Sequence, residues 1–90
     1  MVDASDNVAT ALRQLEPGAS VSLERAGKVV RVTLLQTIPV GHKFSLEDIE
    51  PGEPIVKYGE VVGRATRGIA RGEHVHIHNV EGLRGRGDRQ

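Results

Sequence analysis

The sequence has no cysteine and only two aromatic residues, Phe44 and Tyr58, in 90 residues. Without cysteine, neither a disulfide nor a thiolate zinc site can stabilise the fold. A domain of this size has a thin stability margin, so it depends on an efficient aliphatic core, a metal held by histidine or carboxylate, or a protein partner. The length favours a single domain and argues against a large enzyme with a self-contained pocket.

The chain also lacks net charge and long apolar runs. Twelve Lys and Arg balance twelve Asp and Glu, so no overall field attracts nucleic acid or an anionic membrane. The first residues do not have a signal-peptide pattern, and no apolar run is long enough to cross a bilayer. We therefore expect a cytoplasmic protein that binds neither nucleic acid nor membrane.

Val and Ile, with 12 and 5 residues, dominate the apolar residues and favour strands. The clearest prediction is a hairpin of strands 21–24 and 28–35, with Gly27 in a left-handed conformation in the loop. Both faces of 28–35 are largely apolar, which predicts a central strand that is covered on each side. The segment 7–15 suits either a strand or a helix. Further short strands are expected at 55–58, 60–66 and 74–80.

Tight turns separate these strands. The pattern aliphatic-x-x-Gly-x-x-aliphatic begins at Leu15, Ile49 and Ile69 and is typical of β-turns. Ser45 followed by Asp48 resembles a capping box and predicts one helical turn over Leu46 to Ile49.

We therefore expect an all-β fold of short strands and tight glycine turns, with at most one or two helical turns. The folded domain is expected to span 1–80. Residues 81–90 alternate Gly with Arg, have no apolar periodicity and are expected to form a flexible tail. Open strand edges in such a small domain would also allow a homo-oligomer.

The segment His74-Val-His76-Ile-His78-Asn79 contains the most informative residues. In a strand, period two places the three histidines on one face and Val and Ile on the other. Three imidazoles in a row indicate metal binding or acid–base chemistry, because imidazole is a common ligand and titrates near neutrality. The alternative is a solvated polar face opposite a buried aliphatic face.

Strand geometry limits how these histidines can share an ion. Adjacent members of the trio are roughly 6.6 Å apart along a strand and the outer two roughly 13 Å, whereas a metal–nitrogen bond is only about 2.1 Å. Two adjacent histidines can therefore bind one ion, and His42 is the remaining histidine that could join them. Such a set leaves coordination positions open and indicates part of an active site that a partner completes. Lys43 is a candidate base or carboxylate anchor, or simply a solvated charge.

Two motifs together resemble the SAF domain of the altronate dehydratase family. They are Gly41-His42-Lys43-Phe44-Ser-Leu-Glu-Asp48-Ile49 and Ala70-x-Gly72-Glu73-His74-Val75-His76-x-His78-Asn79, and the resemblance extends back to Asp6-Asn7-Val8-Ala9. It implies an all-β fold of the β-clip type. It also implies metal-dependent hydro-lyase chemistry on sugar acids such as altronate and galactarate, with this chain as a small subunit beside a large catalytic subunit.

The resemblance assigns roles to the histidines. His76, His78 and His42 are expected to bind a divalent metal, Fe²⁺ or another ion such as Mn²⁺. His74 is expected to be a further ligand or an acid–base partner, and His42 is open to the same two roles. Lys43 is the candidate catalytic residue beside them. Two alternatives stay open: the small subunit of a (2R)-sulfolactate sulfo-lyase, and a non-catalytic SAF module that binds carbohydrate or protein.

Overall fold

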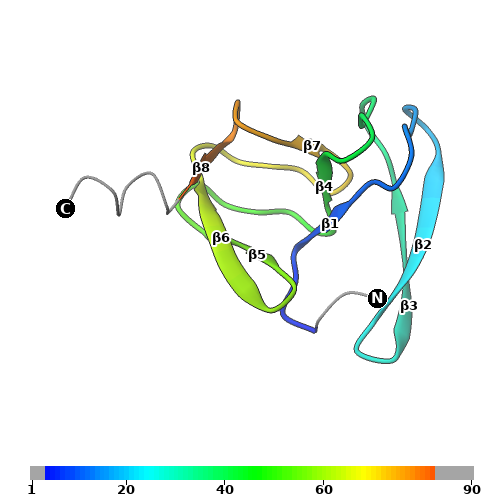
Figure 1. The fold of residues 1–90 in the computed structure, drawn as a ribbon, viewed down its shortest axis with the longest axis horizontal. Helices are drawn as coiled ribbons and strands as arrows, with labels where there is room; N and C mark the ends of the chain where they lie inside the picture. The colour runs from blue at the N-terminus through cyan, green and yellow to red at the C-terminus, as the bar shows by residue number, and fades with distance from the viewer. Residues whose placement is uncertain (1–3, 83–90) are drawn as a thin grey trace.

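The computed structural model describes residues 4–82, and its elements are all β-strands (Figure 1). Within these residues there is no helix, so none that is long and apolar enough to cross a membrane. The predicted all-β fold is confirmed. The eight strands are β1 (Val8–Thr10), β2 (Ser20–Arg25), β3 (Lys28–Thr33), β4 (Lys43–Ser45), β5 (Pro54–Lys57), β6 (Glu60–Ala65), β7 (His74–Val75) and β8 (Val80–Gly82).

The strands form three small antiparallel sheets. The order β1-β4-β7 makes the middle sheet, with the β2-β3 hairpin on one side of it and the β5-β6-β8 sheet on the other (Figure 1). Glu81 and Gly82, which we assigned to the tail, belong to β8. The rest of the predicted tail, residues 83–90, lies outside the described residues.

Both hairpins turn on two residues with positive φ. Ala26 and Gly27 join β2 to β3 with φ of 55° and 79°, and Tyr58 and Gly59 join β5 to β6 with 55° and 76°. This is the backbone of a type I′ turn, which matches the twist of the flanking strands. The predicted hairpin and its left-handed glycine are therefore confirmed.

The prediction that residues 28–35 form a central strand is wrong. β3 pairs only with β2 among the described residues, and Val29 is 76% exposed. Val32 and Leu34 are buried, so one face of the segment covers the core and the other faces solvent. A chain this short has no third layer to cover the second face.

The three predicted glycine turns are present, and a fourth turn has the same form. Gly18, Gly41, Gly52 and Gly72 have φ between 84° and 88°. In each turn the residue after the glycine donates its N–H to the carbonyl three positions earlier, as in a type II turn with glycine at its third position. The fourth segment runs from Ile38 to Phe44. The sequence pattern missed it because the pattern requires an aliphatic last residue, and Phe44 is aromatic.

These turns reveal an internal repeat. Residues 15–44 and 49–75 each run from a glycine turn through a two-residue hairpin to a second glycine turn. The first residues of the two turns pair across each repeat, Leu15 with Ile38 and Ile49 with Ile69. Each repeat therefore closes on itself.

Each repeat contributes its own core, and β1 contributes to both. Val8 packs in the second cluster and the neighbouring Ala9 in the first, because successive side chains of a strand point to opposite faces. The first cluster contains Ala9, Ala11, Leu15, Val32, Leu34, Ile38, Phe44 and Leu46; the second contains Val8, Ile49, Ile55, Ala65, Ile69 and Val75. The middle sheet thus separates the two cores.

The predicted helical turn over Leu46 to Ile49 is wrong. The Ser45 hydroxyl donates to the Glu47 carbonyl, whereas Asp48 Oδ1 accepts the N–H of Arg71 from the second repeat. Leu46 is buried and Ile49 is paired with Ile69. Contacts distant in the chain therefore override the local capping pattern.

Candidate metal centre

The segment from His74 to Val80 is not one strand, contrary to the sequence prediction. β7 ends at Val75, and the chain turns through 76–79 before β8 begins. Val75 is buried, whereas Ile77, predicted on the same face, is 84% exposed. The turn forms because Asn79 binds it from inside, with Oδ1 accepting the N–H of His76 at 3.0 Å.

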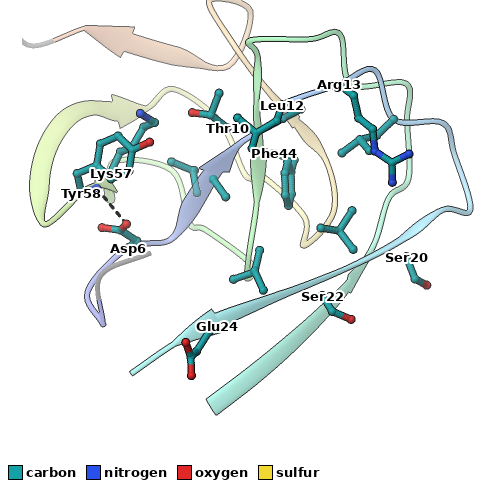
Figure 2. Close-up of a pocket in the computed structure, with 16 residues that line it drawn as sticks. Asp6, Thr10, Leu12, Arg13, Ser20, Ser22, Glu24, Phe44, Lys57 and Tyr58 are labelled. Carbon is teal, nitrogen blue, oxygen red and sulfur yellow. Dashed lines mark hydrogen bonds between the residues drawn. The ribbon is translucent and has the colours of Figure 1, made fainter. Parts of the chain in front are cut away.

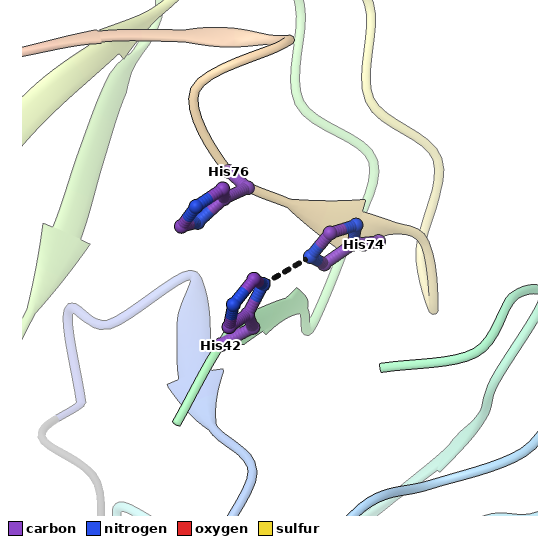
Figure 3. A group of neighbouring side chains, drawn as sticks. All are labelled: His42, His74 and His76. Carbon is purple, nitrogen blue, oxygen red and sulfur yellow. Dashed lines mark hydrogen bonds between the residues drawn. The ribbon is translucent and has the colours of Figure 1, made fainter. Parts of the chain in front are cut away.

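Three histidines meet at the edge of the middle sheet (Figure 3). One ring nitrogen from each of His42, His74 and His76 lies within 4.8 Å of the others. The His42 and His76 rings stack, with centroids 4.0 Å apart and 16° between their planes. His42 Nδ1 and His74 Nε2 share a hydrogen bond of 2.8 Å. All three residues are half-buried, so solvent still reaches the cluster.

Strand register explains why these residues meet. In the β4–β7 pair, Lys43 lies opposite Val75 and Phe44 opposite His74. Continuing this register by one residue places His42 opposite His76. His74 and His76 are two residues apart, so their side chains point to the same face of the strand. The position of His42 is also fixed from the side of β1, because the His42 carbonyl at the end of the Pro39–His42 turn accepts the Ala11 N–H at 2.8 Å.

His74 and His76 favour the neutral form of imidazole. Burial lowers the pKa of His74 below its ordinary value of 6.5, as do the neighbouring His78, His42 and His76 rings, with Glu73 opposing. The pKa of His76 is likewise lowered by burial and then by the charges of His42, Lys43 and His78. Neutral imidazole is the form that binds a metal, so the lowered pKa values of His74 and His76 favour metal binding by these two rings.

The donor set fits a divalent ion. With metal–nitrogen bonds of about 2.1 Å, two nitrogens on one ion lie at most about 4.2 Å apart. The observed spread of 4.8 Å or less is therefore within small ring rotations of a common ion. Imidazole suits iron, zinc, copper and nickel, and three protein ligands leave positions open, as in catalytic rather than structural sites.

The other two residues named from the sequence lie beside the three-nitrogen group. The His78 ring is 5.1 Å from that of His74 and tilted by 35°, outside the group itself. Lys43 is half-buried in β4, and its charge acts on His76. The structure therefore brings His42, His74 and His76 together, whereas the sequence had placed His78 with the ligands.

A hollow lies between β1 and the β2–β3 hairpin (Figure 2). It has a volume of about 670 Å³ and is lined by apolar side chains such as Phe44 and by polar ones such as Asp6 and Lys57. None of the four histidines lines it. The histidine cluster is thus a site separate from this hollow.

Comparison with known proteins identifies the relatives of this chain. Residues 1–83 match the family model described as "Altronate/galactarate dehydratase SAF domain". The chain is 46% identical over 79 residues to altronate dehydratase from Escherichia coli (strain K12), which covers 88% of this chain and 15% of that protein. It is 40% identical over 76 residues to altronate dehydratase from Bacillus subtilis (strain 168), covering 84% and 14%. The chain thus spans only about one seventh of these relatives.

A smaller relative matches as well. The chain is 37% identical over 54 residues to "(2R)-sulfolactate sulfo-lyase subunit alpha" from Chromohalobacter salexigens, covering 60% of this chain and 57% of that subunit. Sequences similar to this domain therefore occur both within long dehydratases and in a lyase subunit of its own.

Proposed function

The chain belongs to the altronate/galactarate dehydratase SAF domain family, and we propose that it is the small subunit of a metal-dependent sugar-acid hydro-lyase. In this proposal it supplies one wall of an active site that a larger chain completes. The observation that carries the proposal is the convergence of His42, His74 and His76 within 4.8 Å. A purely structural domain has no need of three half-buried imidazoles facing one point.

In this proposal His42, His74 and His76 hold the divalent ion, Fe²⁺ or Mn²⁺. When bound, the ion would act as a Lewis acid that draws off the leaving hydroxyl and stabilises negative charge next to the carboxylate. The β4–β7 pairing orients the imidazoles before the ion arrives, because both strands are fixed by the middle sheet.

The neighbouring side chains suit the remaining tasks. Lys43 follows His42 and presents an ammonium group near His76, which supports a role in binding the carboxylate of the substrate. His78, beside His74 but outside the three-nitrogen group, would give a proton to the leaving hydroxyl. The base that removes the proton next to the carboxylate would come from the larger chain.

Exposed aliphatic side chains around the histidines support a partner at this wall. Val40 and Ile77 are 63% and 84% exposed. Val40 lies in the turn that ends at His42, and Ile77 directly follows His76. An apolar rim around a site with open coordination positions fits closure by a second protein surface.

A second candidate is the subunit of a (2R)-sulfolactate sulfo-lyase. The similarity to two alpha subunits of that enzyme, each 37% identical, favours it. Both candidate functions would use the same three histidines. They differ in the group that leaves the substrate, which is water from a sugar acid and sulfite from sulfolactate. A non-catalytic module that binds carbohydrate or protein is the third, and the converging imidazoles argue against it.

The test is co-expression with a candidate large dehydratase subunit, followed by assays on altronate, galactarate and sulfolactate with and without Fe²⁺. We expect water loss from a sugar acid, abolished in His42→Ala and His76→Ala and unchanged in the matched surface variant Glu24→Gln. Sulfite release from sulfolactate alone would assign the second candidate. Full activity of both histidine variants would refute the metal site.

A further inference from the structure

Asn79 is completely buried next to the histidine cluster, with 0% of its surface exposed. We propose that Asn79 is a positioning residue that holds His74 and His76 so that their rings meet His42. The expected effect of Asn79 on metal binding rests on the proposed function above. The expected effect of Asn79 on the positions of the histidine rings rests only on its own contacts.

The Asn79 side chain binds the backbone of both histidines. Its Nδ2 donates to the His74 carbonyl at 2.9 Å, and its Oδ1 accepts the His76 N–H at 3.0 Å. Its own backbone N–H donates to the His76 carbonyl at 3.1 Å. Asn79 therefore fixes the backbone on both sides of Val75, where the chain leaves the strand.

The backbone of Asn79 is anchored in turn. Its carbonyl accepts the N–H of Thr66 at 3.0 Å, and the next residue, Val80, begins β8 opposite Ala65. The histidine turn is thereby joined to the β5-β6-β8 sheet. The position of His76 is thus fixed by a strand that carries no histidine.

The chemistry of the side chain explains why asparagine suits this place. A neutral amide offers a donor, Nδ2, and an acceptor, Oδ1, on the same carbon, which matches the His74 carbonyl and the His76 N–H on either side of Val75. Asp would offer two acceptors, and Ala would leave both backbone groups buried without partners. Removing a group that orients metal ligands commonly lowers metal affinity 10- to 100-fold.

The chain contains a matched control. Asn7 is 9% exposed, donates from Nδ2 to the Pro54 carbonyl at 2.9 Å and accepts the Val56 N–H on Oδ1 at 2.8 Å. It forms the same two-bond clamp on a strand segment, at β5 rather than at the histidines. Asn7→Ala should therefore cost similar stability without disturbing the cluster.

The experiment compares Asn79→Ala with Asn7→Ala in the full 90-residue chain. Zn²⁺ affinity is measured by calorimetry, the folded fraction by urea unfolding, and the proximity of the His42 and His76 rings by NMR cross-relaxation. We expect Asn79→Ala to lose at least tenfold in Zn²⁺ affinity per folded molecule and to lose the ring contact. Asn7→Ala should keep both. Asn79→Ser replaces Asn79→Ala if the alanine variant does not fold.

The outcomes separate this inference from the proposed function. Wild-type affinity and ring contact in the folded Asn79 variant overturn the positioning role, as does an equal loss in Asn7→Ala. If the wild-type chain binds no Zn²⁺, the metal proposal is contradicted and the ring contact alone decides the role of Asn79. Loss of that contact in Asn79→Ala only would support it.

Discussion

His42 is the histidine that the cluster can least replace, because it comes from a different turn than the other three. It stacks on His76 and bonds to His74, so it contacts both members of the group. His74 and His76 share one short segment and could not enclose an ion by themselves. The pairing of two segments, rather than the number of histidines, makes the arrangement suitable for a metal.

The geometry predicts different effects for His76 and His78, two members of the sequence trio. His76→Ala should reduce Zn²⁺ affinity of the isolated chain at least 100-fold, because it removes one of three ligands. His78→Ala should change it less than about threefold, because that ring lies outside the three-nitrogen group. Isothermal calorimetry at pH 7.5 checks both variants. A larger loss in His78→Ala than in His76→Ala would return His78 to the ligand set.

The lowered pKa values predict a pH dependence of stability in the metal-free chain. In the unfolded chain His74 and His76 are protonated near the ordinary pKa of 6.5. In the folded chain their pKa values are lower, so both are protonated only at lower pH. The free energy of unfolding should therefore fall as pH drops below 6.5. Urea midpoints between pH 7.5 and 5.5 measure this. The double variant His74→Gln/His76→Gln should flatten the slope, and an unchanged slope would contradict the assignment.

At the scale of elements, the four glycine turns shape both repeats but do not contribute equally. All four glycines have φ near +86°, which costs an L-residue about 1–2 kcal/mol. A Cβ on Gly18, Gly41 or Gly52 would meet nothing within 4 Å, whereas one on Gly72 would lie 2.2 Å from the Thr33 carbonyl oxygen. The Gly72 turn, which precedes the histidines, therefore packs closely against Thr33 of the first repeat.

This difference predicts the outcome of an alanine series. Gly18→Ala should cost about 1–2 kcal/mol from its backbone conformation alone. Gly72→Ala should cost more than about 4 kcal/mol, because the Thr33 backbone must also move. Chemical denaturation of both variants measures the difference. Equal losses would show that the close contact between the repeats adds nothing.

The same elements show what sequence reasoning could and could not reach. Gly27 and three glycine turns were predictable, because short-range backbone preferences decide them. The strand 74–80 was mispredicted because the buried Asn79 amide outweighs the Val/Ile alternation. The meeting of His42 with His76 depends on the β4–β7 register between residues 34 apart in the chain, which local patterns do not specify. Asn79 itself was visible only as the last residue of the His-x-His-Asn motif.

At the scale of the whole molecule, the cluster lies where the two repeats join. His42 ends the last turn of the first repeat, and His74 and His76 follow the last turn of the second. Asp6 and Asn7 bind the second hairpin from the N-terminal segment, with Asp6 accepting the N–H groups of Tyr58 and Gly59 at 2.9 and 2.8 Å. The positions of the histidines thus depend on both repeats, and the N-terminal segment helps to hold the second repeat in place.

Under the proposed function, the apolar rim at Val40 and Ile77 predicts where a larger chain would bind. Ile77→Ser should weaken the complex at least tenfold, because an 84% exposed aliphatic at the rim would be buried on association. Val29→Ser is the control: it is 76% exposed but lies on the distant β2–β3 hairpin. Biolayer interferometry with the large subunit measures both. A stronger effect of Val29→Ser would move the interface to the hairpin.

The central claim is that this chain holds the metal of a shared active site. The most direct measurement is anomalous diffraction from crystals of the complex with the large subunit, grown with Mn²⁺ or Fe²⁺. The account predicts an anomalous peak within about 2.1–2.3 Å of one nitrogen each of His42, His74 and His76. A peak bound only by residues of the larger chain, with the three imidazoles outside its coordination sphere, would contradict it.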